Sequence, residues 1–156
     1  MPGYYVEKPV RQPRPKSKLS VESDRIIDEV IAYLSIPENA VFYDQSSFGN
    51  ISALNHCQTE GCLAGWMVFV KTPRKYNKLV KGDHGDVIFD MASASMTLAN
   101  GSPANTANLF TGSGTGWPKQ FSKRWIKTLT MEFAAQRRAQ ALIAIDRLKF
   151  FKRNAR

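Results

Sequence analysis

The densest apolar run of the chain, Leu63–Val70, constrains the fold more than any other stretch of the sequence. Small residues stand beside Trp66 in this run, which indicates a closely packed helix that begins near Gly61 and ends near Val70. At 156 residues the chain is long enough to bury a core without disulfide support, and its length fits one domain. We therefore expect the other elements to pack around a buried helix centred on Trp66.

Two cysteines and a histidine flank the start of this helix, and three interpretations of them remain open. A thiol at a helix N-terminus, as expected for Cys62, can have a lowered pKa and be reactive. His56, Cys57 and Cys62 could offer three ligands to a metal, although a tetrahedral zinc site needs a fourth and the other histidine is His84. The cysteines could instead be small apolar side chains packed in the core. We favour packing, because a core run and not a polar pocket follows them.

The residues before this run predict an amphipathic helix. Ser20 or Ser23 is expected to cap it, and carboxylates in its first turn suit the helix dipole. Pro37 is expected to end it. The apolar residues fall at helical spacing and predict one buried face: Ile26, Ile27, Val30, Ile31 and Leu34.

Further helices are expected in the second half of the chain. Asp86 is expected to cap one that closes at Asn100-Gly101, and Ser102-Pro103 to open a short one. Two basic helices follow Trp117-Pro118, the second running to about Lys152. Their expected buried stripes are Phe121, Trp125, Ile126 and Leu129 on the first, and Met131, Ala134, Ala135, Leu142, Ile145 and Leu148 on the second.

Residues 1–20 are unlike the rest of the chain. They hold five cations against Glu7 alone, and four prolines interrupt every possible helix. This arm is either a solvated tail or a segment that orders along an anionic partner. We therefore predict a mostly α fold: a compact single-domain bundle of about five helices over residues 21–156, behind a disordered basic arm.

The stretch from Cys57 to Trp66 reads Cys-Gln-Thr-Glu-Gly-Cys-Leu-Ala-Gly-Trp. It resembles the C-G-T-x-x-C-[IL]-A-G-W signature of a family of small uncharacterised proteins in bacterial genomes, phages and plasmids. The resemblance covers residues 24–151, including a Leu-Phe, a Trp-Pro and a closing Ala-rich helix after the signature. Gln58 departs from it, since glycine is usual there, and the basic segments look peculiar to this chain. The resemblance implies no established activity.

Charge is distributed unevenly along the sequence. The chain has a formal net charge of +9 and a pI of about 9.8. Residues 21–70 hold seven carboxylates against Arg25 alone, whereas residues 119–156 hold eleven cations against Glu132 and Asp146. An excess of this kind favours phosphate backbones or acidic protein faces as partners. We expect the cations of the arm, of residues 71–86 and of the last helix to gather on one side of the molecule.

Residues 71–86 are expected to form a basic loop, with five cations against Asp83 and Asp86. Because Tyr76 lies inside it, the loop could contact phosphates and stack on a base, or it could be a solvated connector. Residues 111–116 are glycine-rich but lack the Gly-Lys-Ser/Thr of a P-loop, so we interpret them as a flexible link. The candidate residues for binding nucleic acid or an acidic partner are Arg11, Arg14, Lys16, Lys18, Lys71, Arg74, Lys75, Tyr76, Lys78, Lys149, Lys152 and Arg153.

The sequence contains no known catalytic pattern: no His-Glu-x-x-His, no Gly-x-Ser-x-Gly and no histidine cluster. We find no secretory signal and no apolar run near the roughly 18 residues that span a bilayer, and therefore expect a cytoplasmic protein with reduced thiols and no membrane partner. We predict a non-enzymatic binding or adaptor protein, without a cofactor, that contacts nucleic acid or a nucleoprotein complex. The alternative is a protein–protein module, such as a phage- or mobile-element-type inhibitor or assembly factor, that docks on an acidic protein surface.

Overall fold

The computed structural model of the chain describes residues 18–44, 62–81, 85–110 and 117–156. Its helices are α1 (Val21–Leu34), α2 (Pro37–Ala40), α3 (Leu63–Lys71), α4 (Pro73–Lys81), α5 (Gly85–Ala94), α6 (Ala107–Phe110), α7 (Lys119–Thr128) and α8 (Phe133–Asn154). The mostly helical fold class is confirmed. The described residues form eight helical segments instead of about five, because α2 and α6 are short pieces of four residues and α4 stands where a loop was expected.

Helix α1 forms as its cap and apolar spacing predict. The side chain of Ser20 accepts a hydrogen bond from the main-chain N–H of Ser23 at 3.2 Å, which satisfies one donor of the first turn. The helix ends at Leu34, and Pro37 begins α2 instead of ending α1, because a proline at the first helical position has no N–H to lose. The predicted inner face of α1 is buried at Ile26, Ile27, Val30 and Leu34.

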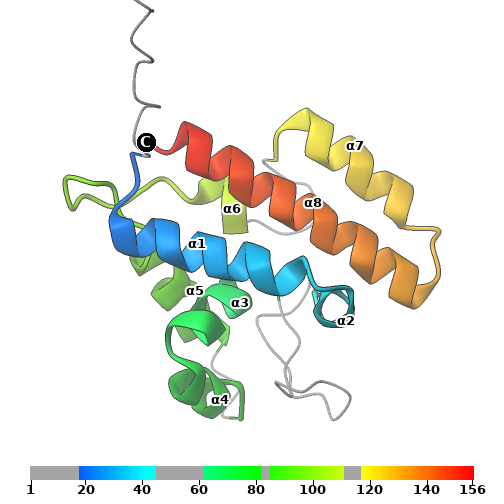
Figure 1. Cartoon of the computed structure of the whole chain (residues 1–156), viewed down its shortest axis with the longest axis horizontal. Coiled ribbons are helices and arrows are strands. Elements are labelled where there is room, and N and C mark those ends of the chain that lie inside the picture. The colour runs from blue at the N-terminus through cyan, green and yellow to red at the C-terminus, as the bar shows by residue number, and fades with distance from the viewer. Residues whose placement is uncertain (1–17, 45–61, 82–84, 111–116) are drawn as a thin grey trace, which may run out of the picture.

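Helix α3 lies at the centre of the core, as the apolar run predicts. Residues 63–68 are all buried, so this stretch of the helix exposes no face to solvent. Helices α1, α4, α5 and α6 pack around it, and α8 packs on the other side of α1 (Figure 1). Aromatic rings connect α3 to its neighbours: the ring centroid of Trp66 lies 6.0 Å from that of Tyr33 on α1, and the ring centroid of Phe69 lies 5.6 Å from that of Tyr76 on α4.

The segment between α5 and α6 differs from the prediction. Helix α5 ends at Ala94, and Asn100-Gly101 forms a tight turn in which Gly101 has φ 86° and Thr97 pairs with Pro103. Leu98 in this segment pairs with Leu19, which is buried. Residues 18–20, predicted as the end of the arm, therefore belong to the folded body, whereas residues 1–17 lie outside the described residues.

Helices α7 and α8 form an antiparallel hairpin along one edge of the molecule (Figure 1). Phe121 and Trp125 of α7 are buried, and so are Ile145 and Leu148 of α8. The other members of the two predicted stripes are exposed, and several of them lie at or beside the turn between the two helices. These exposed residues are Ile126, Leu129, Met131, Ala134, Ala135 and Leu142.

Candidate nucleic-acid interface

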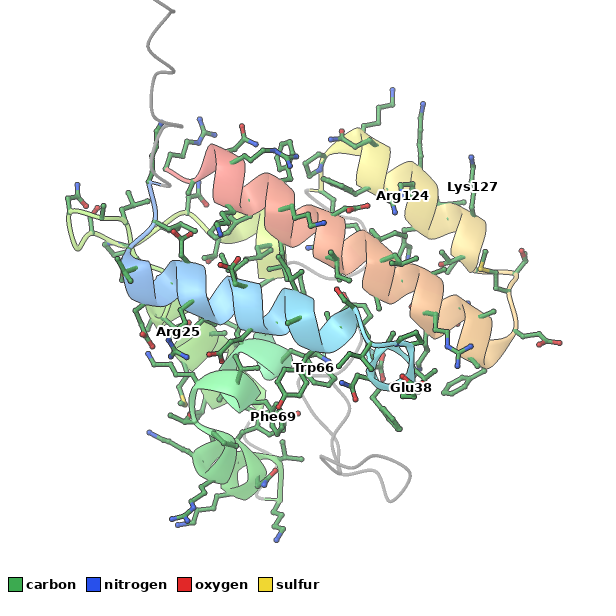
Figure 2. All side chains as sticks on the ribbon, viewed as in Figure 1. Arg25, Glu38, Trp66, Phe69, Arg124 and Lys127 are labelled. Carbon is green, nitrogen blue, oxygen red and sulfur yellow. The ribbon has the colours of Figure 1, made fainter. Side chains whose placement is uncertain are left out.

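Helix α4 carries the densest group of exposed cations, here called the α4 basic face: Arg74, Lys75, Lys78 and Lys81. At 3.6 residues per turn these four residues fall within an arc of about 120°, while apolar side chains occupy the opposite side. Within the described chain, none of the four forms an ion pair. Figure 2 shows the side chains of α4 extending from the lower end of the molecule into solvent.

Tyr76 does not belong to this face, so the prediction that it stacks on a base is wrong. Only 1% of its surface is exposed, and its ring centroid lies 5.6 Å from that of Phe69 in an edge-to-face contact. The physical reason is that residues 73–81 form a helix and not a loop. Helical periodicity directs Tyr76, Leu79 and Val80 to the core and the cations to solvent.

Lys71, the last residue of α3, is exposed next to this helix. Its charge also acts on Glu22 of α1. The pKa of that carboxyl is lowered first by a hydrogen bond from Arg25, and to a smaller degree by the charges of Arg25 and Lys71. Lys71 therefore faces an acidic neighbour, unlike the four members of the α4 basic face.

A second group of cations, the C-terminal basic surface, lies where the end of α8 meets the first turn of α7. Lys18, Arg153 and Arg156 line one pocket together with Phe121 of α7, which places residues from both ends of the described chain side by side. Lys149 is exposed one turn before Arg153. Helix α7 adds three exposed lysines at i, i+4 and i+8 along one face, a row about 12 Å long: Lys119, Lys123 and Lys127.

Several cations of α7 and α8 are instead held by carboxylates of the protein. The Nζ of Lys152 lies 2.8 Å from Asp28 and 3.8 Å from Asp24, and the hydrogen bond to Asp28 is the main cause that raises the pKa of Lys152. Lys152 therefore joins α8 to α1, which corrects its prediction as a binding residue. Arg124 likewise pairs with Asp146 at 2.6 Å, and Arg137 with Asp44 at 3.5 Å.

The two basic surfaces lie at opposite ends of the molecule, so the expectation of a single basic side is wrong. Helix α4 packs against α3 and α5, and α7 packs against α8. Helices α1 and α3 separate them, with α4 at the lower end and α7 at the upper end of Figure 1. Helix α1, which lies between the two surfaces in Figure 1, carries exposed carboxylates, among them Glu22 and Asp28. The two basic surfaces are therefore separate candidate contacts for an anionic partner.

The thiol of Cys62 is buried at the N-terminus of α3. Burial raises its pKa, and hydrogen bonds from the main chain of Gly65 and Ala64 oppose that rise only in part. A buried thiol with a raised pKa is a poor nucleophile, so the structure favours packing over reactivity for Cys62. His56 and Cys57 lie outside the described residues, and among those described there is no group of three metal-ligating side chains.

Three of the other predicted residues, Arg11, Arg14 and Lys16, and the glycine-rich stretch 111–116 also lie outside the described residues. Sequence reasoning did not include the lysine row of α7 among the binding residues, although its i, i+4, i+8 spacing is visible in the sequence. It could not find the pocket, because the lining residues come from segments far apart in the chain.

A comparison of the chain with protein-family models, with curated proteins and with solved structures found no match. The resemblance of Cys57 to Trp66 to a family signature therefore stays a prediction. None of the helices in the described ranges is long and apolar enough to cross a membrane.

Proposed function

We propose that the protein binds nucleic acid through the α4 basic face and the C-terminal basic surface, as a binding or adaptor protein and not as an enzyme. The α4 basic face carries this proposal, because it presents four exposed cations on one helix face with no carboxylate on the same helix. These cations form no ion pair within the described chain, so no such pair has to break when they bind a phosphate. The release of counterions from the nucleic acid then favours binding.

The C-terminal basic surface supports the same function. Its lysine row offers one ammonium group about every 6 Å along α7, and Figure 2 shows Lys127 extending away from α8 into solvent. Lysines on an exposed helix face contact phosphates without reading base edges. We therefore expect binding that depends strongly on salt and weakly on nucleotide sequence.

The test compares two double variants that remove the same charge. Arg74→Gln with Lys78→Gln changes the α4 basic face, whereas Arg25→Gln with Arg124→Gln removes two exposed arginines that are ion-paired with Glu22, Glu29 and Asp146. Affinity for a mixed-sequence labelled oligonucleotide is measured by fluorescence anisotropy between 50 and 200 mM NaCl. The α4 variant should weaken binding about tenfold at the lowest salt and reduce the slope of log K against log[salt] by about 1.5.

The control variant should change affinity by less than about threefold, because its arginines are already held by carboxylates. Equal losses in the two variants would show that only net charge matters. Absence of binding by the unmodified protein at 50 mM salt would overturn the proposal.

A protein–protein function is the second candidate, and the exposed apolar residues at the turn of the α7–α8 hairpin favour it. Leu129 and Phe133 are exposed by 57% and 66%, next to the cations of α7. An acidic protein surface with an apolar centre would complement this arrangement. Its test is a pull-down from the native host after nuclease treatment: capture of an acidic partner that survives nuclease and is lost in Leu129→Ser with Phe133→Ser would support it. Retention in the double variant, or loss after nuclease, would contradict it.

A further inference from the structure

A pocket of about 470 Å³ opens in the C-terminal basic surface. This volume falls within the range of about 300–1,000 Å³ that is usual for small-molecule sites. The pocket lies between the last two turns of α8, the first turn of α7 and the residues around Asn105. Its lining residues come from four separate parts of the sequence.

A buried arginine holds the walls of this pocket in place. Nη2 of Arg147 donates a hydrogen bond to the main-chain oxygen of Leu109 at 2.5 Å, which ties α8 to α6. The guanidinium carbon lies 3.6 Å from the ring centroid of Trp117, which ties α8 to the residue pair that precedes α7. Because Arg147 is only 3% exposed, these contacts are shielded from water and keep the three segments together.

Positive charge lines the rim of the pocket. Lys18, Arg153 and Arg156 are exposed there, and none of the three is ion-paired within the described chain. The eleven described residues of the lining include no aspartate or glutamate. The charged side chains of this concave site are all cationic, which concentrates positive potential in it and attracts an anion.

Aromatic rings form the apolar part of the same pocket. Phe121 is buried and contacts Phe150 edge-to-face, with ring centroids 5.6 Å apart. Phe150 and Phe151 are half-buried, so parts of both rings remain accessible from the pocket. Two amide side chains, Asn105 and Asn154, also line it and belong to the residue type that hydrogen-bonds base edges.

We propose that this pocket binds one nucleoside phosphate, with the planar base against Phe150 and Phe151 and the phosphate at Lys18, Arg153 and Arg156. The combination of stacking surface and cationic rim is the arrangement by which proteins hold an unpaired nucleotide. The nucleotide is either free in solution or an unpaired unit of a strand, and the second source rests on the proposed nucleic-acid function.

The probes separate the two halves of the ligand. AMP, adenosine and inorganic phosphate are each titrated into the full chain at 50 mM NaCl, and their affinities are measured by isothermal titration calorimetry. AMP should bind at least about tenfold more tightly than either adenosine or phosphate, because it alone engages both the rings and the cations. Equal affinity for AMP and phosphate, or no AMP binding up to 10 mM, would overturn the proposal.

A matched pair of variants tests the location. Arg153→Gln should weaken AMP binding by at least about fivefold, whereas Arg138→Gln, an exposed arginine near the other end of the same helix and outside the lining, should change it by less than about twofold. Circular dichroism confirms that both variants are folded. Phe151→Leu should weaken AMP binding without affecting phosphate binding, since it removes a ring and no charge. Equal effects of Arg153→Gln and Arg138→Gln would place the ligand elsewhere and refute the assignment.

Further experiments distinguish a free nucleotide from an unpaired nucleotide of a strand, and test this proposal separately from the proposed function. If an unpaired nucleotide of a strand is the ligand, an oligonucleotide with a single-stranded end displaces AMP and a blunt duplex of equal charge does not. If neither oligonucleotide displaces AMP, the ligand is a free nucleotide. The double variant Arg74→Gln with Lys78→Gln should leave AMP affinity unchanged. AMP binding without oligonucleotide binding contradicts the proposed function alone, whereas α4-dependent oligonucleotide binding without AMP binding contradicts the pocket alone.

Discussion

Ser23 shows how a single side chain can serve both a helix start and a tertiary contact. It is fully buried, and its hydroxyl donates a hydrogen bond to the main-chain oxygen of Ser95 at 2.7 Å. The hydroxyl oxygen of Ser23 also accepts a hydrogen bond from the main-chain N–H of Thr97 at 2.9 Å. Thr97 also donates from its hydroxyl to Ser20, the N-cap residue, at 2.8 Å. These hydroxyls attach the first turn of α1 to the segment after α5, next to the pairing of Leu19 with Leu98.

Replacing Ser23 by alanine should therefore destabilise the fold. The substitution leaves the buried carbonyl of Ser95 and the partly buried N–H of Thr97 without this partner, which costs about 1–3 kcal/mol of the free energy of unfolding. Urea unfolding measures the change. Ser35→Ala is the control: the hydroxyl of Ser35 bonds the oxygen of Ile31 at the exposed end of the same helix, and its loss should cost less than about 0.5 kcal/mol. A similar cost for both variants would show that the buried cluster adds nothing to stability.

At the scale of the element, α8 carries neighbouring cations that do different work. Lys152 contacts the carboxylates of α1, whereas Lys149 and Arg153 are exposed. The inner face of the same helix buries Ala141, Ala144 and Leu148 against the core. The cations of this helix are thus divided between ion pairs within the fold and exposure to solvent.

Lys152→Gln should lower the free energy of unfolding by about 0.5–1 kcal/mol, since its ion pairs are partly exposed and screened by salt. Lys149→Gln should leave stability within about 0.5 kcal/mol of the unmodified protein. Because the carboxylates raise the pKa of Lys152, its stabilising contribution is present below the ordinary value of 10.5 and is lost as pH rises through the higher folded value. Urea unfolding at pH 7 with and without 1 M NaCl measures the ion-pair contribution of Lys152. The prediction fails if added salt does not reduce the difference in the free energy of unfolding between the two variants.

At the scale of the whole molecule, the separation of the two basic surfaces matters more than the net charge of +9. The helices between them include α1, whose outward side carries carboxylates. A short anionic ligand meets one surface or the other, whereas a long strand has to follow the outside of the protein to reach both. Under the proposed function, the two surfaces would bind anions independently of each other.

We therefore expect two short oligonucleotides to bind each chain. Hexanucleotides, near the lower end of the site sizes known for single-strand binding proteins, should bind with a stoichiometry of about two at 50 mM NaCl. The double variant Arg74→Gln with Lys78→Gln should bind about one, with the remaining site unchanged in affinity, because the surfaces share no residue. Native mass spectrometry counts the bound strands, and a stoichiometry of one in the unmodified protein contradicts the prediction.

The sequence by itself determined the helical class, the burial of α3 and a serine cap for α1, although it left Ser20 and Ser23 as alternatives, since a serine cap and a continuous apolar run act through neighbouring residues. It also identified the exposed cations of α4, although not the helix that orients them. Tyr76 shows what the sequence did not reveal. Its position among cations suggested an exposed ring, but Tyr76 lies on the side of helix α4 that faces the core.

Only the tertiary structure decided which cations are paired and where the others gather. Lys152 meets Asp28 across a sequence separation of 124 residues, and the pocket joins Lys18 to Arg153. Such contacts follow from the packing of α8 between α1 and α7, and local patterns carry no information about that packing. The net charge therefore follows from the sequence, but the positions of the cations on the surface depend on how the helices pack.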